Sequence, residues 1–195
     1  MSIIKPINGL LVQAAWRPLN DLGLEHLHVF KTTHGFHVKG HLVRKLENQV
    51  FSATYTVECA DDWTFQSVDI QVTTDETRSL ILTIDDNGVW RDGTSAERAD
   101  LFGCFEIDIS ATPFTNTLAI GRLNLSVGQG QDIHAAYIRL PELTVEKVPQ
   151  RYTARGVVEG QVVHTYEGLF RHFTADLATD EHGLVLDYPE TFIRV

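Results

Sequence analysis

Strict alternation of apolar and polar residues is the feature that most constrains this chain. Between Phe51 and Cys59 every second residue is apolar or aromatic, and the residues between them are Ser, Thr, Thr and Glu. The segments 36–46 and 68–73 largely alternate in the same way. Successive side chains of a strand point to opposite faces of a sheet, so each segment has one buried face and one solvated face. This pattern is typical of antiparallel sheets.

Turn signals separate these alternating runs. Asn87-Gly88 follows a run that ends at Ile84 and predicts a two-residue hairpin turn, because both turn positions need a positive φ. Further turn signals lie at 33–35, 47–48, 61–62, 75–76 and 182–183. The first half of the chain is therefore predicted to be a β-meander.

Signals for helices are sparse. Residues 94–97, Thr-Ser-Ala-Glu, have the spacing of a capping box and predict a short helix that extends to Leu101. Residues 20–27 are a second candidate for a helical turn. The sequence contains no internal repeat, no low-complexity tract and no linker.

After Gly103 the pattern changes, because both alternating sets of residues become apolar. The change is clearest in 133–140, and the segments 118–125 and 184–188 are predicted to be mixed strands of the same kind. Such strands are covered on both faces. One solution is a curled sheet with one face on a second layer and the other lining a cavity. The alternative is a two-layer sandwich with a solid core, and periodicity does not separate the two.

Length and charge narrow the class of protein. The 195 residues fit one domain, 1–195, whose core needs neither a disulfide nor a structural metal. The net charge of −10 disfavours binding to nucleic acid and to anionic membrane surfaces. Cys59 and Cys104 are expected to be buried and reduced rather than paired.

The distribution of apolar residues bears on localisation. No stretch approaches the roughly 20 apolar residues of a membrane-spanning helix, so no integral membrane association is expected. The apolar run within 1–15 is interrupted by Pro6, Asn8 and Gly9 and is too short for an export signal. We therefore expect a cytoplasmic protein.

Catalytic and metal-binding motifs are absent from the sequence. It contains no G-x-S-x-G, no H-E-x-x-H, no P-loop and no C-x-x-C. His26 and His28 would share one face of a strand and could bind a metal together. No carboxylate follows them within residues 29–33, so we expect a structural or solvated pair and no metal or cofactor.

Two carboxylates lie in apolar surroundings, Asp108 and Asp187. Such surroundings can raise a carboxyl pKa towards the range of a general acid. The alternative is a structural carboxylate paired with Arg122, Arg151 or a backbone turn, and we favour it. We expect binding rather than catalysis and name no catalytic residue.

Three stretches resemble a known family. They read LFGCFEIDI at 101–109, TPFTNTL at 112–118 and LVLDYP at 184–189, with QRYT at 150–153 between them. Together they look like the "putative glycolipid-binding" family of bacterial proteins. That resemblance implies a spoonbill fold, in which a long antiparallel sheet wraps into a partial barrel, and it implies a lipid or glycolipid ligand.

The chain departs from the family pattern at three positions. Similar members often have Pro and Arg where this chain has Ala119 and Gly121, so only Arg122 of an arginine pair remains. Glu190 replaces a small residue after the Asp-Tyr-Pro run. If the arginine pair engages an anionic head group, this version of the site is weakened.

The run 112–117 also has its own local physics. Pro113 removes a backbone donor and disfavours helical geometry at Thr112, so the run is predicted to be a loop or a strand edge. It either closes the barrel structurally or places Asn116 and Arg122 at a cavity mouth with Phe114 as apolar lining.

The prediction as a whole is a mostly β protein with one long antiparallel sheet curled into a partial barrel and few short helices. An apolar ligand, a lipid or glycolipid, would lie in the hollow of the sheet. The alternatives are a hydrolase-type enzyme that acts on an amphiphilic substrate, or a protein-interaction module that uses the sheet edge or concave face. The expected ligand-binding residues are Trp63, Trp90, Phe114, Asn116, Arg122, Tyr137, Tyr152 and Tyr188. The tryptophans either pack in the core or stack on a head group, and Tyr152 or Arg122 would orient the ligand.

Overall fold

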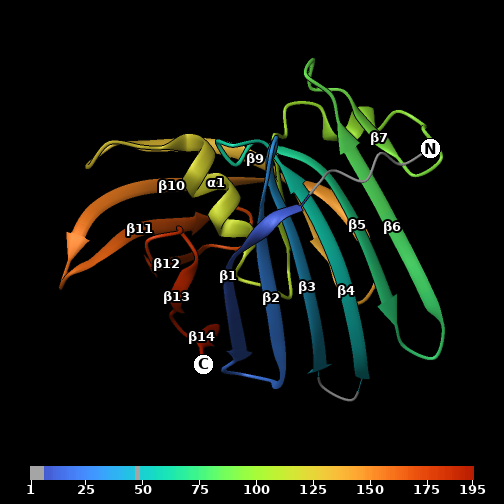
Figure 1. The fold of residues 1–195 in the computed structure, drawn as a ribbon, viewed down its shortest axis with the longest axis horizontal. Coiled ribbons are helices and arrows are strands. Elements are labelled where there is room, and N and C mark those ends of the chain that lie inside the picture. Colours follow the sequence, from blue (N-terminus) through green and yellow to red (C-terminus); the bar gives the residue numbers. More distant parts are fainter. Residues whose placement is uncertain (1–6, 47–48) are drawn as a thin grey trace.

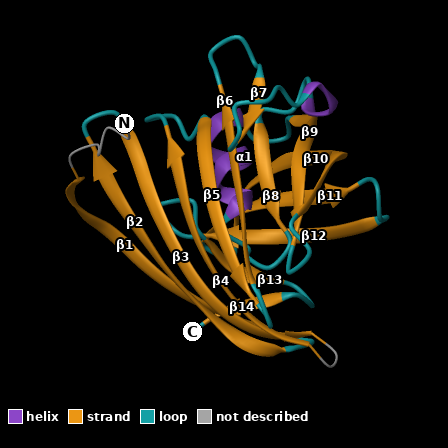
Figure 2. Ribbon diagram, turned by 90° about the vertical axis from the view of Figure 1, so that its right-hand side faces the viewer, coloured by secondary structure: helices purple, strands orange, loops and turns teal. Residues whose placement is uncertain are grey.

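A single sheet dominates the computed structural model, which describes residues 7–46 and 49–195. The sheet has 14 strands in the order β7-β6-β5-β4-β3-β2-β1-β14-β13-β12-β11-β10-β9-β8. It is curled but not closed, and α1 lies in its hollow (Figures 1 and 2). The predicted fold class is confirmed, and a single sheet excludes the two-layer sandwich.

The elements divide into two halves of the chain. The first half contains β1 (Ile7–Pro18), β2 (Leu22–Thr32), β3 (Gly35–Leu46), β4 (Gln49–Cys59), β5 (Phe65–Thr73), β6 (Thr77–Ile84) and β7 (Trp90–Asp92). The second half contains a 3₁₀ turn, η1 (Ala99–Leu101), then β8 (Glu106–Ile109), α1 (Thr115–Leu123), β9 (Gly130–Arg139), β10 (Thr144–Val158), β11 (Gln161–Gly168), β12 (Phe173–Thr179), β13 (Val185–Tyr188) and β14 (Phe192–Arg194).

The first and last strands, β1 and β14, are neighbours in the middle of the sheet. β1 pairs with β14 through Trp16 and Arg194, and the chain meanders outwards from β1 to one edge at β7. It then crosses to the opposite edge at β8 and meanders back to β14. The neighbouring strands are antiparallel except β8 and β9, which are parallel because α1 connects them.

The segment between the two edge strands is held against β7 by hydrogen bonds to Trp90. The indole N–H of Trp90 donates to the carbonyl of Cys104 at 3.0 Å, and the backbone N–H of Arg98 donates to the carbonyl of Trp90 at 2.9 Å. Cys59 and Cys104 are both buried and are not joined by a disulfide, as predicted.

The predicted turns fall between strands wherever the structure describes them. The turn signals at 33–35, 61–62, 75–76 and 182–183 all coincide with strand connections, whereas 47–48 and residues 1–6 of the N-terminal run lie outside the described residues. The hairpin at Asn87-Gly88 is also present, between β6 and β7. Its loop is longer than predicted: Gly88 has a φ of 77° and donates to the carbonyl of Asp85 at 2.9 Å.

Both predicted short helices are wrong in extent or type. Residues 20–27 fall largely in β2, where Glu25, Leu27 and Val29 alternate into the interior. In the 94–101 segment only η1 is helical. The carboxylate of Asp92 accepts the backbone N–H groups of Thr94 and Ala96 and so holds this segment in a turn.

The helix α1 corrects a larger prediction, because the run 112–118 was expected to be a loop or strand edge and 118–125 a strand. Thr112 Oγ1 accepts the N–H of Phe114 at 3.0 Å just before the helix begins. Asn124 ends the helix with a left-handed φ of 41°. The helix is buried on two sides, with Leu118 in the core of the first half and Ala119 in that of the second. A helix covered on both sides lacks the single apolar stripe that marks an amphipathic helix.

Candidate functional site

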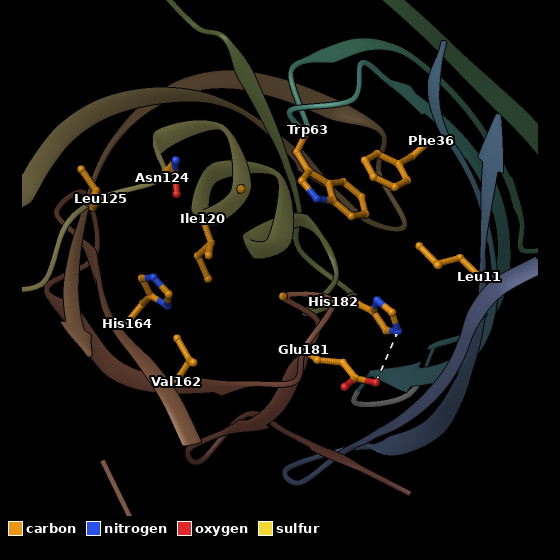
Figure 3. A pocket seen from close by; sticks show the side chains of 12 residues that line it. Leu11, Phe36, Trp63, Ile120, Asn124, Leu125, Val162, His164, Glu181 and His182 are labelled. Atoms are coloured by element: carbon orange, nitrogen blue, oxygen red, sulfur yellow. Dashed lines mark ion pairs between the residues drawn. The ribbon is translucent and has the colours of Figure 1, made fainter. Parts of the chain in front are cut away.

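A pocket of about 480 Å³ opens between α1 and both halves of the curled sheet (Figure 3). We call it the central pocket. Its lining residues are Leu11, Phe36, Trp63, Ile120, Gly121, Asn124, Leu125, Val162, His164, Glu181, His182 and Gly183. Its size is within the range of small-molecule sites, and most of its side chains are apolar with a few polar groups among them.

One wall of the central pocket is aromatic. The ring of Trp63 stacks on that of Phe36, with centroids 4.1 Å apart and planes 9° from parallel. Its edge meets Phe114 at 6.4 Å. Trp63 adopts an unusual φ of 67°, and its backbone N–H donates to the carbonyl of Ala60 at 3.1 Å. The backbone turn at 60–63 and the rings of Phe36 and Phe114 therefore fix the position of the indole in the pocket wall.

Gly121 permits the close approach of this aromatic wall to α1. A Cβ atom at position 121 would lie 2.3 Å from Cδ1 of Trp63, which is far inside van der Waals contact. The indole thus occupies the space that any side chain at 121 would need. The loss of an arginine at Gly121, noted above as a departure from similar sequences, is coupled here to the position of Trp63.

The opposite wall carries most of the polar groups (Figure 3). His164 comes from β11, and burial lowers its pKa, so its imidazole is neutral at pH 7. Its Nδ1 is buried and has no hydrogen-bond partner among the described residues. Glu181 and His182 form an ion pair of 3.7 Å at the rim when the histidine is protonated. Asn124, at the end of α1, adds a further amide, so a ligand with hydroxyl groups would find acceptors and donors on more than one side of the pocket.

Of the predicted ligand-binding residues, Trp63 lines the central pocket. Phe114 is fully buried beside it and stacks with Tyr55 at 6.3 Å. Asn116 is a buried residue of α1, and the hydroxyl of Tyr152 from β10 donates to its Oδ1 at 2.9 Å. These three residues support the pocket from behind rather than lining it.

The other predicted residues lie elsewhere. Trp90 is buried in the first half and stacks on Phe65 at 5.3 Å. Tyr137 packs on Phe170, and Tyr188 belongs to the buried aromatic cluster of the second half. Arg122 points away from the central pocket and forms an ion pair with Glu106 at a second pocket.

The carboxylates considered for catalysis do not meet. Asp108 accepts hydrogen bonds from Gln150 Nε2 at 2.6 Å and from Thr115 Oγ1 at 3.3 Å, and burial raises its pKa. His26 is exposed and pairs with Gln13 Oε1 at 3.3 Å. Asp187 is exposed on β13, well separated from β2 and β8 in the strand order. The described hydrogen bonds therefore do not join these groups into an acid–base pair.

Sequence reasoning missed most of the central pocket. Ile120, Gly121 and Asn124 belong to the unpredicted helix, and His164 and Val162 reach the pocket from a distant strand. Only the turn signal at 182–183 marked part of the rim. Over the described ranges, no group of three or more His, Cys, Asp or Glu could hold a metal ion. No helix in the same ranges is long and apolar enough to cross a membrane.

Fold and pocket together define a class: an open, curled β-sheet that encloses one helix and presents an amphipathic pocket at its mouth. A family model described as "Putative glycolipid-binding" matches residues 13–194. The chain belongs to this family, and the predicted resemblance is confirmed.

Solved structures show a similar fold. The chain is similar to a DUF1089 family protein from Pseudomonas aeruginosa, with 31% identity, a TM-score of 0.79, and coverage of 88% of this chain and 92% of that chain. A β-barrel-like protein of the DUF1849 group from Brucella abortus shares the fold at 10% identity, with a TM-score of 0.50 and 93% of each chain covered. No curated protein matches the sequence.

Proposed function

We propose that this protein binds a lipid or glycolipid non-covalently and holds part of its acyl chain in the central pocket. The observation that carries the proposal is the lining of this pocket, which combines aromatic and aliphatic side chains with a few polar groups. An amphiphile needs this combination, because apolar burial supplies affinity and a few polar contacts set orientation. The family description points to the same ligand class.

Some of the residues predicted from the sequence contact the ligand in this proposal, and others support the residues that do. Trp63 contacts the chain directly, and Phe114 holds the indole in place. The hydrogen bond between Tyr152 and Asn116 fixes the helix against the sheet. These residues therefore set the shape of the pocket even where they are themselves buried.

Energetics limit what the pocket alone can achieve. Burial of about ten methylenes gives about 8 kcal/mol at about 0.8 kcal/mol each. Association costs remove several kcal/mol of this. A net affinity in the micromolar range, about −8 kcal/mol, then needs a further contribution from the head group.

A pocket-filling variant tests the proposal. Val162 is 44% exposed and lines the central pocket, so Val162→Trp fills the pocket at little cost to folding. Val158 is 47% exposed and, by its pairing with Gln161, lies on the other face of the same hairpin. Val158→Trp is therefore the matched control.

The measurement is native mass spectrometry after incubation with a medium-chain diacylglycerol and a monoglucosyl diacylglycerol. We expect a one-to-one complex with at least one of them for the wild type and for Val158→Trp. Occupancy should fall at least about tenfold for Val162→Trp. Equal occupancy in the two tryptophan variants would show that the lipid binds elsewhere, and no complex in any protein would overturn the proposal.

A further inference from the structure

A second pocket of about 230 Å³ lies on the other side of α1, around the ion pair of Glu106 and Arg122. We call it the ion-pair pocket. Its lining residues are Gly103, Phe105, Glu106, Arg122, Gln131, Asp132, Ile133 and His134. With about 30 Å³ for each water in the liquid, its volume corresponds to about seven or eight waters, which is the size of one sugar ring.

Glu106 is a buried carboxylate, and one of its two oxygens has no hydrogen-bond partner in the described part of the chain. Its side chain is 2% exposed, and Oε1 accepts a hydrogen bond from Nε of Arg122 and forms an ion pair with Nη2 of the same guanidinium. Oε2 is buried and has no hydrogen-bond partner among residues 7–46 and 49–195. An unpaired buried acceptor costs free energy, so a donor supplied by a ligand would be bound favourably.

The charges around the pocket select against a charged ligand. The Arg122 guanidinium is already neutralised by Glu106, and Asp132 adds a second carboxylate at the rim, where it pairs with Arg151 at 2.6 Å. Each carboxylate of the lining is already paired with an arginine, so neither a phosphate nor an ammonium group finds an unpaired opposite charge among the lining residues. A neutral group that offers both hydroxyl donors and acceptors suits this arrangement best.

Phe105 supplies an apolar surface beside the ion pair. Its side chain is 48% exposed, although a phenylalanine normally gains by burial. The guanidinium carbon of Arg122 lies 5.7 Å from the ring centroid. An exposed aromatic ring beside a carboxylate and a guanidinium can pack on the C–H face of a sugar while the polar groups bond its hydroxyls.

We propose that the ion-pair pocket binds a neutral, hydroxyl-rich head group of one sugar ring, with Glu106 Oε2 as acceptor and Phe105 as the stacking surface. This inference rests on the proposed function. The last turn of α1 joins the two sites, because Ile120 and Gly121 line the central pocket and Arg122 lines the ion-pair pocket. The head group supplies the affinity that the acyl chain alone does not.

The experiment compares two lipids that share their acyl chains, a medium-chain diacylglycerol and its monoglucosyl derivative, by titration against the intact protein. For the wild type we expect the glucosyl lipid to bind at least about tenfold more tightly. Phe105→Ala should reduce this ratio towards one and leave diacylglycerol binding unchanged. Because Phe105 is exposed, this variant is expected to fold.

Glu106→Gln should reduce the same ratio at least about fivefold. The control is Glu146→Gln on β10, an exposed carboxylate that pairs with Arg139 and does not line the pocket. A phosphatidic acid with the same chains should bind no more tightly than the diacylglycerol.

The outcomes separate this inference from the proposed function. Equal binding of the two neutral lipids by the wild type would overturn the inference and leave lipid binding intact. Tighter binding of phosphatidic acid than of the glucosyl lipid would assign the pocket to anions and also overturn it. Binding of neither neutral lipid would overturn the proposed function, and the inference with it.

Discussion

The two halves of the sheet differ in the side chains that fill the interior of the curled sheet. In the first half the inward residues are mostly aliphatic or aromatic and fully buried, as with Leu27, Val38, Leu42, Val57 and Ile70. In the second half the interior contains hydrogen-bonded polar and phenolic groups, among them Gln150, Tyr152, Tyr166 and Tyr188. The first half is a packing scaffold of apolar side chains. The interior of the second half also contains polar groups, which apolar packing alone would not need.

A buried carboxylate in each half sharpens this difference. Glu25 in the first half is 2% exposed, and its Oε2 has no hydrogen-bond partner in the described part of the chain. Asp108 in the second half has its carboxylate bonded to Gln150 and Thr115. Both oxygens of Asp108 have a partner, whereas Glu25, like Glu106 in the second half, keeps one unpaired oxygen despite its contact with Tyr55.

The largest expected effect is in the first-half core. Leu42 is fully buried, so Leu42→Ala removes packed methyl groups and leaves a cavity. We expect the free energy of unfolding to fall by about 2–5 kcal/mol in urea denaturation. Val43→Ala, next along the strand but 46% exposed, should change it by about 0.5 kcal/mol or less. Similar losses for the two variants would contradict the assignment of a packing scaffold.

The next effect concerns pH and Glu25. Burial raises the pKa of Glu25 from 4.5 to about 7. Between these values the folded protein keeps a proton that the unfolded chain has lost, so the free energy of unfolding falls as pH rises. Relative to the wild type, Glu25→Gln should gain about 3 kcal/mol between pH 4.5 and pH 8 in urea denaturation. Parallel pH profiles for the two proteins would show that Glu25 is not buried as an acid.

A third prediction tests the contact between the first half and α1. A Gly→Ala change inside a helix normally stabilises by up to about 1 kcal/mol. At Gly121 the new Cβ collides with Trp63, so we expect Gly121→Ala to destabilise by about 1–3 kcal/mol. In a Trp63→Ala background the same change should become neutral or stabilising. A destabilisation of the same size in both backgrounds would rule out this contact as its cause.

The smallest effect tests the polar interior of the second half. Tyr152→Phe removes the hydroxyl that donates to Asn116 Oδ1 and leaves that buried oxygen without its donor. We expect a loss of about 1–2 kcal/mol in the free energy of unfolding. Tyr137→Phe is a useful comparison, because the Tyr137 hydroxyl hydrogen-bonds the side chain of Ser110 rather than a buried amide oxygen. An equal loss in the free energy of unfolding for the two variants would indicate that the hydrogen bond between Tyr152 and Asn116 contributes no more to stability than the hydroxyl of Tyr137 does.

The contrast between the halves also explains what could be read from the sequence. The alternation from Phe51 to Cys59 predicts β4 because one face of that strand is apolar and the other is solvated. The helix α1 escaped prediction because it is covered on both sides, and Pro113, which argued for a loop, lies just before the helix rather than inside it.

The sites were harder to predict than the strands, because they join residues that are distant in sequence. Trp63 was predicted, but nothing local distinguishes it from Trp90, which is in the core. The partnership of Glu106 with Arg122 depends on a helix that the sequence did not reveal. His164 reaches the central pocket only because the sheet curls, and a pattern of period two carries no information about curvature.

Quenching of Trp63 by a lipid with brominated acyl chains tests the central claim most directly, because bromine quenches only indoles that it contacts. Trp16 and Trp90 are each 1% exposed in the core, whereas Trp63 lines the pocket. The account predicts saturable, one-to-one quenching in the wild type, and little quenching in Trp63→Phe despite retained binding. Binding without quenching of Trp63, or quenching that persists in Trp63→Phe, would place the acyl chain outside the central pocket and contradict the account.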